Sequence, residues 1–167
     1  DLLESHLRAA IAAIEGRVAK VLIQRRFLWQ IDDWRDAGEQ ALPVAPVSSI
    51  VSLTLVDANG VSTLADAATY RLVPDIHRPR IAGRGRALPT VPLEGRIELI
   101  FEAGFGPAWG EVPDDLQQAA LLLAAEFYEH RNDDGTAQPG LPFAVVALIE
   151  RWRQVRILGG GTSGRRS

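Results

Sequence analysis

The chain has 167 residues and a net charge of −3, with 47% hydrophobic and 23% charged residues. This length allows one domain with a hydrophobic core of its own, and the charge balance argues against bulk binding to nucleic acid. The sequence has no cysteine, which excludes disulfides and thiolate metal sites, and no apolar run of the roughly 18–20 residues that span a bilayer, so we expect no membrane partner.

The first element that the sequence predicts is a long amphipathic helix over residues 2–22. Its apolar stripe at helical spacing consists of Leu3, Leu7, Ala10, Ile11, Ile14, Val18 and Val21. Near residue 24 the period changes from 3.6 to 2, because Phe27, Trp29 and Ile31 occupy alternate positions. A helix therefore gives way to a strand at this point.

Residues 25–102 predict a β-insertion. Its first segment, residues 32–47, is polar and then contains prolines, which favours a loop. Residues 51–64 alternate on both sides of an Asp-Ala-Asn-Gly turn and predict a hairpin. Short strands are expected at residues 70–73 and 97–102, so the insertion is predicted to be a small antiparallel sheet.

Residues 74–92 interrupt this pattern. The segment carries four prolines and four arginines, and it predicts a long exposed excursion with one short strand around Ile81. We call its four arginines the basic loop. They are Arg78, Arg80, Arg84 and Arg86.

Residues 114–131 predict the central core helix. Gly104, Phe105 and Gly106 come after the preceding strand and indicate a tight turn. Asp114 and Asp115 at the start of the helix complement the positive end of its dipole. Nothing in this helix is chemically reactive, so the chain is organised around a packing element.

A third helix is predicted over residues 141–153, and the glycine-rich residues 154–167 predict a flexible C-terminal tail. The fold class is therefore α+β: a helical core, made of the long first helix and two C-terminal helices, with an inserted small antiparallel sheet. Residues 1–153 are expected to form a single domain.

The sequence offers no catalytic, metal or cofactor site. His6, His77 and His130 lie far apart and have no second ligand at helical or hairpin spacing. The glycines at the central turn match neither the dinucleotide fingerprint nor a phosphate loop, and no serine has the context of a hydrolase nucleophile. We therefore expect a protein that is not an enzyme.

Two basic features remain, the basic loop and the arginines around the start of the tail. Both could be solvated surface, which is common for such charge runs. Both could also contact an acidic protein or DNA, because arginine suits carboxylate and phosphate alike. One functional hypothesis is therefore a monomeric nucleic-acid- or ligand-binding α+β module that uses the loop at 78–86.

The order of motifs over about residues 15–156 resembles the head–tail connector (adaptor) family of tailed bacteriophages and gene transfer agents. The motifs are a Pro-Val-x-x-Ile hairpin start, an Ala-Gly-Phe-Gly bend, a Val-Pro-x-x-Leu helix start, a Tyr-Glu-x-Arg helix end and a final Arg-Trp-Arg-x-x-Arg. They lie at residues 46–50, 103–106, 112–119, 128–131 and 151–156. Compared with the family pattern, we expect a further N-terminal helix that is usual in relatives to be missing or cut short here.

The resemblance implies a structural adaptor: a ring, typically of twelve copies, that joins the capsid portal to a tail-side stopper or terminator protein and lines the DNA channel. It implies a place at the head–tail interface of a phage or gene transfer agent particle, with the protein in the bacterial host cytoplasm before assembly, and transient non-specific contact with passing DNA. The segment that leads into the tail mixes apolar and arginine side chains, which suits ordering against a partner, and the resemblance makes the portal that partner. The expected portal-binding residues are Arg151, Trp152, Arg153, Val155, Arg156, Ile157 and Leu158.

Overall fold

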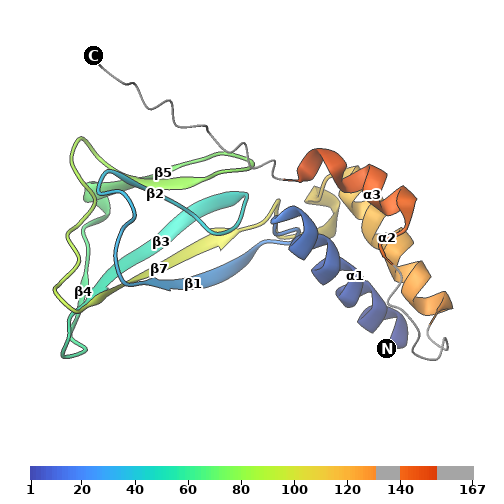
Figure 1. The fold of residues 1–167 in the computed structure, drawn as a ribbon, viewed down its shortest axis with the longest axis horizontal. Coiled ribbons are helices and arrows are strands. Elements are labelled where there is room, and N and C mark those ends of the chain that lie inside the picture. The colour runs from blue at the N-terminus through green and yellow to red at the C-terminus, as the bar shows by residue number, and fades with distance from the viewer. Residues whose placement is uncertain (131–139, 154–167) are drawn as a thin grey trace, which may run out of the picture.

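In the computed structural model, which describes residues 1–130 and 140–153, three α-helices lie at one end of the fold and two antiparallel sheets lie at the other (Figure 1). This arrangement confirms the predicted α+β class. The helices come from the two ends of the chain, and the strands come from the stretch between them.

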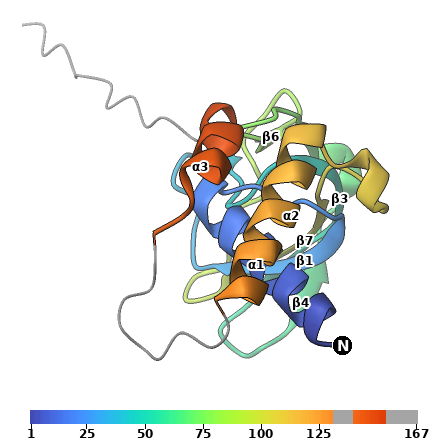
Figure 2. The ribbon, with the colours of Figure 1, turned by 90° about the vertical axis from the view of Figure 1, so that its right-hand side faces the viewer.

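The helical end is a bundle in which α2 packs against both other helices (Figure 2). Its elements are α1 (Leu2–Val18), α2 (Asp114–Glu129), α3 (Phe143–Ile149) and the 3₁₀ turn η3 (Glu150–Trp152). Their apolar stripes meet in one buried cluster that includes Ile14, Leu116, Leu123, Val145 and Ile149. Pro142 precedes α3 and Pro113 precedes α2, as expected for a residue that lacks the backbone N–H.

The first helix is shorter than predicted, because it ends at Val18 and not at residue 22. Ala19 adopts a left-handed conformation with φ of 54° and stops the helix. The carboxylate of Glu15 then accepts the backbone N–H of Leu22 over 2.9 Å and pairs with Arg25 over 2.8 Å. The apolar pattern in the sequence extends beyond Val18 because Val21 and Leu22 are also buried, although they lie in an extended segment and not in the helix.

The β end contains two sheets where the sequence predicted one. The four-stranded sheet has the order β1-β7-β3-β4 and the three-stranded sheet has the order β2-β6-β5. The strands are β1 (Arg25–Ile31), β2 (Glu39–Ala41), β3 (Val47–Val56), β4 (Ser62–Leu64), β5 (Tyr70–Val73), β6 (Arg80–Gly83) and β7 (Arg96–Ala103). The predicted hairpin is confirmed as β3 and β4, and the strands predicted at 27–31, 70–73 and 97–102 are confirmed as β1, β5 and β7.

The two sheets share a core between them. Leu53, Leu99 and Phe101 of the larger sheet and Ile81 of the smaller one belong to the same buried cluster. The prediction of an exposed excursion at 74–92 is therefore wrong in its middle, because β6 is the central strand of the smaller sheet. The short strand expected around Ile81 is confirmed.

The chain passes between the sheets and the helices at a junction of three extended segments. The backbone N–H of Phe105 donates to the carbonyl of Leu22 over 3.0 Å, and that of Val21 donates to Ala45 over 2.8 Å. Gly104 lies in the middle of this junction with φ of +135°, and a Cβ there would lie 2.4 Å from the backbone nitrogen of Gln24. The chain bends at Gly104 and Phe105, and glycine is required at position 104 by both conformation and space.

Candidate functional site

The structure separates the arginines of the basic loop. Arg80 lies in β6 and pairs with Glu39 of the neighbouring strand β2 over 2.7 Å. The Nε of Arg84 donates to the backbone carbonyl of Tyr70 over 2.9 Å. Arg78 and Arg86 are exposed. Arg80 and Arg84 therefore serve contacts within the subunit, which the sequence pattern did not reveal.

Three of the expected portal-binding residues, Arg151, Trp152 and Arg153, lie just before the C-terminal tail, which we call the base of the tail. They have different environments. Trp152 is 8% exposed and belongs to the helical core, where its ring makes an edge contact with Phe105 at 5.3 Å between centroids. Its Nε1 donates to Oδ2 of Asp115 over 2.8 Å. Arg151 and Arg153 are exposed. Trp152 therefore anchors the chain to the core, while the two arginines beside it face solvent.

The carboxylate of Asp115 organises this region. Its Oδ2 also accepts the Nε of Arg151 over 2.7 Å, and the guanidinium of Arg151 lies 4.9 Å from the centre of the Trp152 ring. One carboxylate at the first turn of α2 therefore holds two consecutive residues of η3. The expected portal contacts Val155, Arg156, Ile157 and Leu158 lie outside the described residues.

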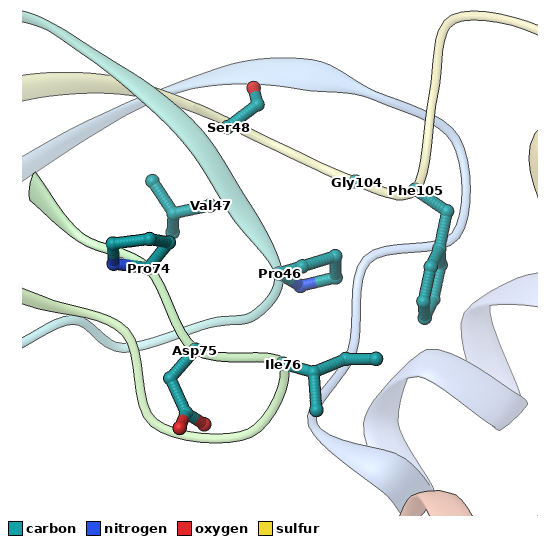
Figure 3. A pocket seen from close by; sticks show the side chains of 8 residues that line it. All are labelled: Pro46, Val47, Ser48, Pro74, Asp75, Ile76, Gly104 and Phe105. Atoms are coloured by element: carbon teal, nitrogen blue, oxygen red, sulfur yellow. The ribbon is translucent and has the colours of Figure 1, made fainter.

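A hollow of about 430 Å³ lies at the junction of sheets and helices (Figure 3). Its mouth is mainly apolar, and Figure 3 shows Ile76 extending toward Phe105, with Pro46 beside them. The same Phe105 ring contacts Trp152, so this hollow adjoins the anchor of the tail. Asp75 also lines the hollow, and the backbone N–H groups of Arg78 and His77 hold the pKa of its carboxyl below the usual value.

The single lysine of the chain, Lys20, is buried at this junction and is 1% exposed. Its Nζ donates to the carbonyl of Val18 over a long 3.4 Å. Burial lowers the pKa of Lys20, and the negative charge of Asp75 offsets part of that effect. This burial could not be predicted from the sequence, because a lysine at the end of a helical stripe is normally solvated.

Two apolar surfaces on the helices were also missed. Large side chains are exposed on the outer face of α1 and α2, and Phe143 is exposed at the start of α3. The outer-face residues are Leu2, Leu3, Leu121, Leu122 and Tyr128. The sequence contains a sign of the exposed face on α2. Residues 119–125 read Ala-Ala-Leu-Leu-Leu-Ala-Ala, so this part of the helix has no polar side that could face solvent.

Within residues 1–130 and 140–153, no three histidine, aspartate or glutamate side chains are grouped so that they could hold a metal ion. None of the helices described there has both the length and the apolar character to cross a membrane. The features that remain are surfaces: the basic loop, the base of the tail, the junction hollow and the exposed apolar faces of the helices.

Comparisons with protein-family models and with curated proteins give no match. Solved structures of gene transfer agent (GTA) particles do match, each at 56% identity over 95% of this chain. The neck of an empty particle computed with C6 symmetry matches with a TM-score of 0.84 over 80% of its chain. The neck of a native particle computed with C12 symmetry matches at 0.85 over 85%, and the virion of a native particle matches at 0.85 over 79%.

Proposed function

The chain belongs to the head–tail connector (adaptor) family of tailed bacteriophages and gene transfer agents, and from this premise we propose that it forms the adaptor ring in the neck of a gene transfer agent particle. The family is structural, so the protein is not an enzyme. The observation that carries the proposal is the 56% identity over 95% of the chain with chains of particle necks.

We propose twelve copies in the ring. One related neck was computed with C12 symmetry and another with C6 symmetry. The two are compatible, since a ring of twelve identical subunits also obeys sixfold symmetry. In a cyclic ring each subunit contacts its neighbours through two different surfaces. Exposed apolar faces on more than one helix fit that requirement.

Residues 1–153 are proposed to act as a single adaptor domain, with residues 154–167 as a tail that reaches the portal. The buried Trp152 supports this assignment, because it ties the end of the proposed domain to the subunit core. Arg151 and Arg153 stay exposed beside that point and can take part in the same contact. The face of the ring that points away from the portal is proposed to bind the tail-side stopper or terminator protein.

The basic loop is assigned a secondary role as a transient, non-specific contact for DNA in the channel or for an acidic surface of a partner. Arg78 and Arg86 are exposed for such a contact. Because Arg80 and Arg84 hold partners inside the subunit, the geometry does not favour a monomeric nucleic-acid-binding module built on this loop.

Deleting the gene in the producing bacterium tests the proposal. We expect filled heads and free tails, seen by negative-stain microscopy, and no gene transfer, with both defects repaired by a plasmid copy of the full chain. Tailed particles at the normal yield in the deletion strain are incompatible with an adaptor that joins head to tail.

A further inference from the structure

The central helix α2 is apolar on more sides than its subunit covers. Its inner side chains Ala120 and Leu123 are buried against α1 and α3, as is the neighbouring Ala119. On its outer side Leu121 is 50% exposed and Leu122 is also exposed. Residues 119–125 in the middle of α2 are apolar all round, and such a stretch of helix is normally covered all round. Within the described residues, α1 and α3 cover only the inner side of α2. The exposed outer side is therefore a candidate surface for binding a partner.

The outer side carries a groove where α2 meets the first two turns of α1. The groove encloses about 340 Å³ and is lined by Leu3, Leu7, Leu121, Ala124, Ala125 and Tyr128. This volume lies at the small end of the roughly 300–1,000 Å³ range of protein ligand pockets. Its lining is almost entirely apolar and its volume leaves room for a large side chain, so it suits an apolar side chain from a partner.

A side chain of that kind is exposed on the third helix. Phe143, the first residue of α3, is 88% exposed. Ala144 and Ala147, which follow it, are exposed as well. Such small residues allow a partner helix to approach closely. Phe143 therefore projects from a helix face whose other exposed residues are small.

The two features lie on different sides of the bundle. Figure 2 shows α3 on one side of α2 and the N-terminus of α1 on the other. A subunit that carries a groove on one side and a projecting aromatic group on the other can join copies head to tail, which is the arrangement of a cyclic ring. Among the large exposed apolar residues of the described helices, all but Phe143 lie on α1 or α2. Phe143 is therefore the candidate group for binding the groove of another copy.

We infer that Phe143 of one subunit packs into the groove formed by Leu3, Leu7, Leu121 and Tyr128 of the next subunit. This inference rests on the proposed ring and names the two surfaces that build it. The occupant of the groove is thus a second copy of this chain, and the contact repeats at every subunit boundary.

Cysteine cross-linking tests the pairing directly, because the natural chain contains no cysteine. The variant carries Ala125→Cys in the groove and Ala144→Cys beside Phe143, both at exposed positions. Particles from a deletion strain that expresses this variant are treated with a short bis-maleimide and analysed on a denaturing gel. We expect a ladder of multimers, because each copy is linked to two different neighbours.

The controls are the two single variants and a pair in which Ala58→Cys, in the exposed turn of the β3–β4 hairpin, replaces the groove position. None of them should give a ladder. If microscopy shows a ring of this protein in the neck but the groove pair gives no ladder, the ring stands and the pairing is overturned. If the neck shows no ring, the proposed function itself fails.

A second pair of variants examines the aromatic group itself. Phe143→Ser should lower the amount of the protein in purified particles roughly tenfold or more, because it removes the apolar area that the contact buries. Phe143→Leu keeps most of that area and should stay within about twofold of the natural chain. Normal incorporation of Phe143→Ser, with an unchanged melting temperature, would overturn the inference.

Discussion

The indole nitrogen of Trp152 donates to the carboxylate of Asp115 over 2.8 Å, and this hydrogen bond ties the last described turn of the chain to the first turn of the central helix. The end of the described chain is therefore fixed to the core of the subunit. A buried tryptophan held in this way belongs to the subunit fold, even though it lies next to a segment proposed to bind the portal.

Replacing Asp115 by Ala should lower the free energy of unfolding by about 1.5–3 kcal/mol, the range for a hydrogen bond to a charged group. The matched control is Asp114→Ala, because Asp114 lies in the same helical turn but is exposed. The control should cost about 0.3–1 kcal/mol through the helix dipole alone. Urea unfolding followed by tryptophan fluorescence measures both, and equal losses would show that the contacts of Asp115 with Trp152 and Arg151 contribute nothing.

Two truncations separate the tail from the anchor. A chain that ends after Arg153 should keep its melting temperature but fail to attach to filled heads, because the proposed portal contact is gone. A chain that ends after Glu150 loses Trp152 as well and should lose about 3–5 kcal/mol of stability, the usual cost of deleting a large buried aromatic side chain. Calorimetry and particle yield give the two readouts. Normal joining of heads to tails by the chain that ends after Arg153 would exclude the tail as the docking element.

Gly104 should tolerate no side chain. Gly104→Ala combines an unfavourable φ of +135° with a Cβ that would lie 2.4 Å from Gln24 backbone atoms, and we expect a loss of about 3 kcal/mol or more. Gly60→Ala is the matched control, because its φ is +81° and its surroundings are open. It should cost about 1 kcal/mol. Thermal unfolding compares the two variants, and similar losses would mean that the junction yields to the extra atom.

The sequence predicted those parts of the fold that depend on local periodicity. The stripe from Leu3 to Val18 indicated α1, and the alternation in Ile97, Leu99 and Phe101 indicated β7. It did not predict β2, because Glu39–Ala41 has no apolar alternation and becomes a strand through its pairing with β6. Such pairings depend on contacts between distant residues, which a single sequence does not display.

The surfaces were harder to predict than the elements. The spacing of Trp152 among arginines indicated a binding segment, yet its burial depends on Asp115 and Phe105, which lie far away in the sequence. The basic loop was visible as a charge pattern, but the partner of Arg80 on β2 was not. The run of apolar residues at 119–125 predicts a core helix, but periodicity cannot show which side of that helix the subunit leaves open.

Lys20 provides a prediction about pH. Its pKa in the folded protein is below the ordinary value of 10.5, so between these two values the unfolded chain binds more protons than the folded one. The stability contributed by this site therefore rises with pH through that window, and the cost of the buried charge is fully present below it. Lys20→Met should be more stable than the natural chain at pH 7, by roughly 1 kcal/mol, with a difference that shrinks toward pH 10.5.

Arg17→Met is the control for Lys20, because it removes the same charge from an exposed position on the last turn of α1. Its effect on stability should be small and should not vary with pH over this range. Urea unfolding at several pH values gives the comparison. A difference between Lys20→Met and the natural chain that stays constant from pH 7 to pH 10.5 would contradict the assigned shift.

The central claim is that this chain forms a twelve-membered ring in the particle neck. Electron cryomicroscopy of particles from the producing bacterium, reconstructed at the neck without imposed symmetry, tests it most directly. The account predicts twelve copies of the fold around a central channel, with α3 of each copy against α1 and α2 of the next. A neck that contains one or a few copies of this chain, or none, would contradict it.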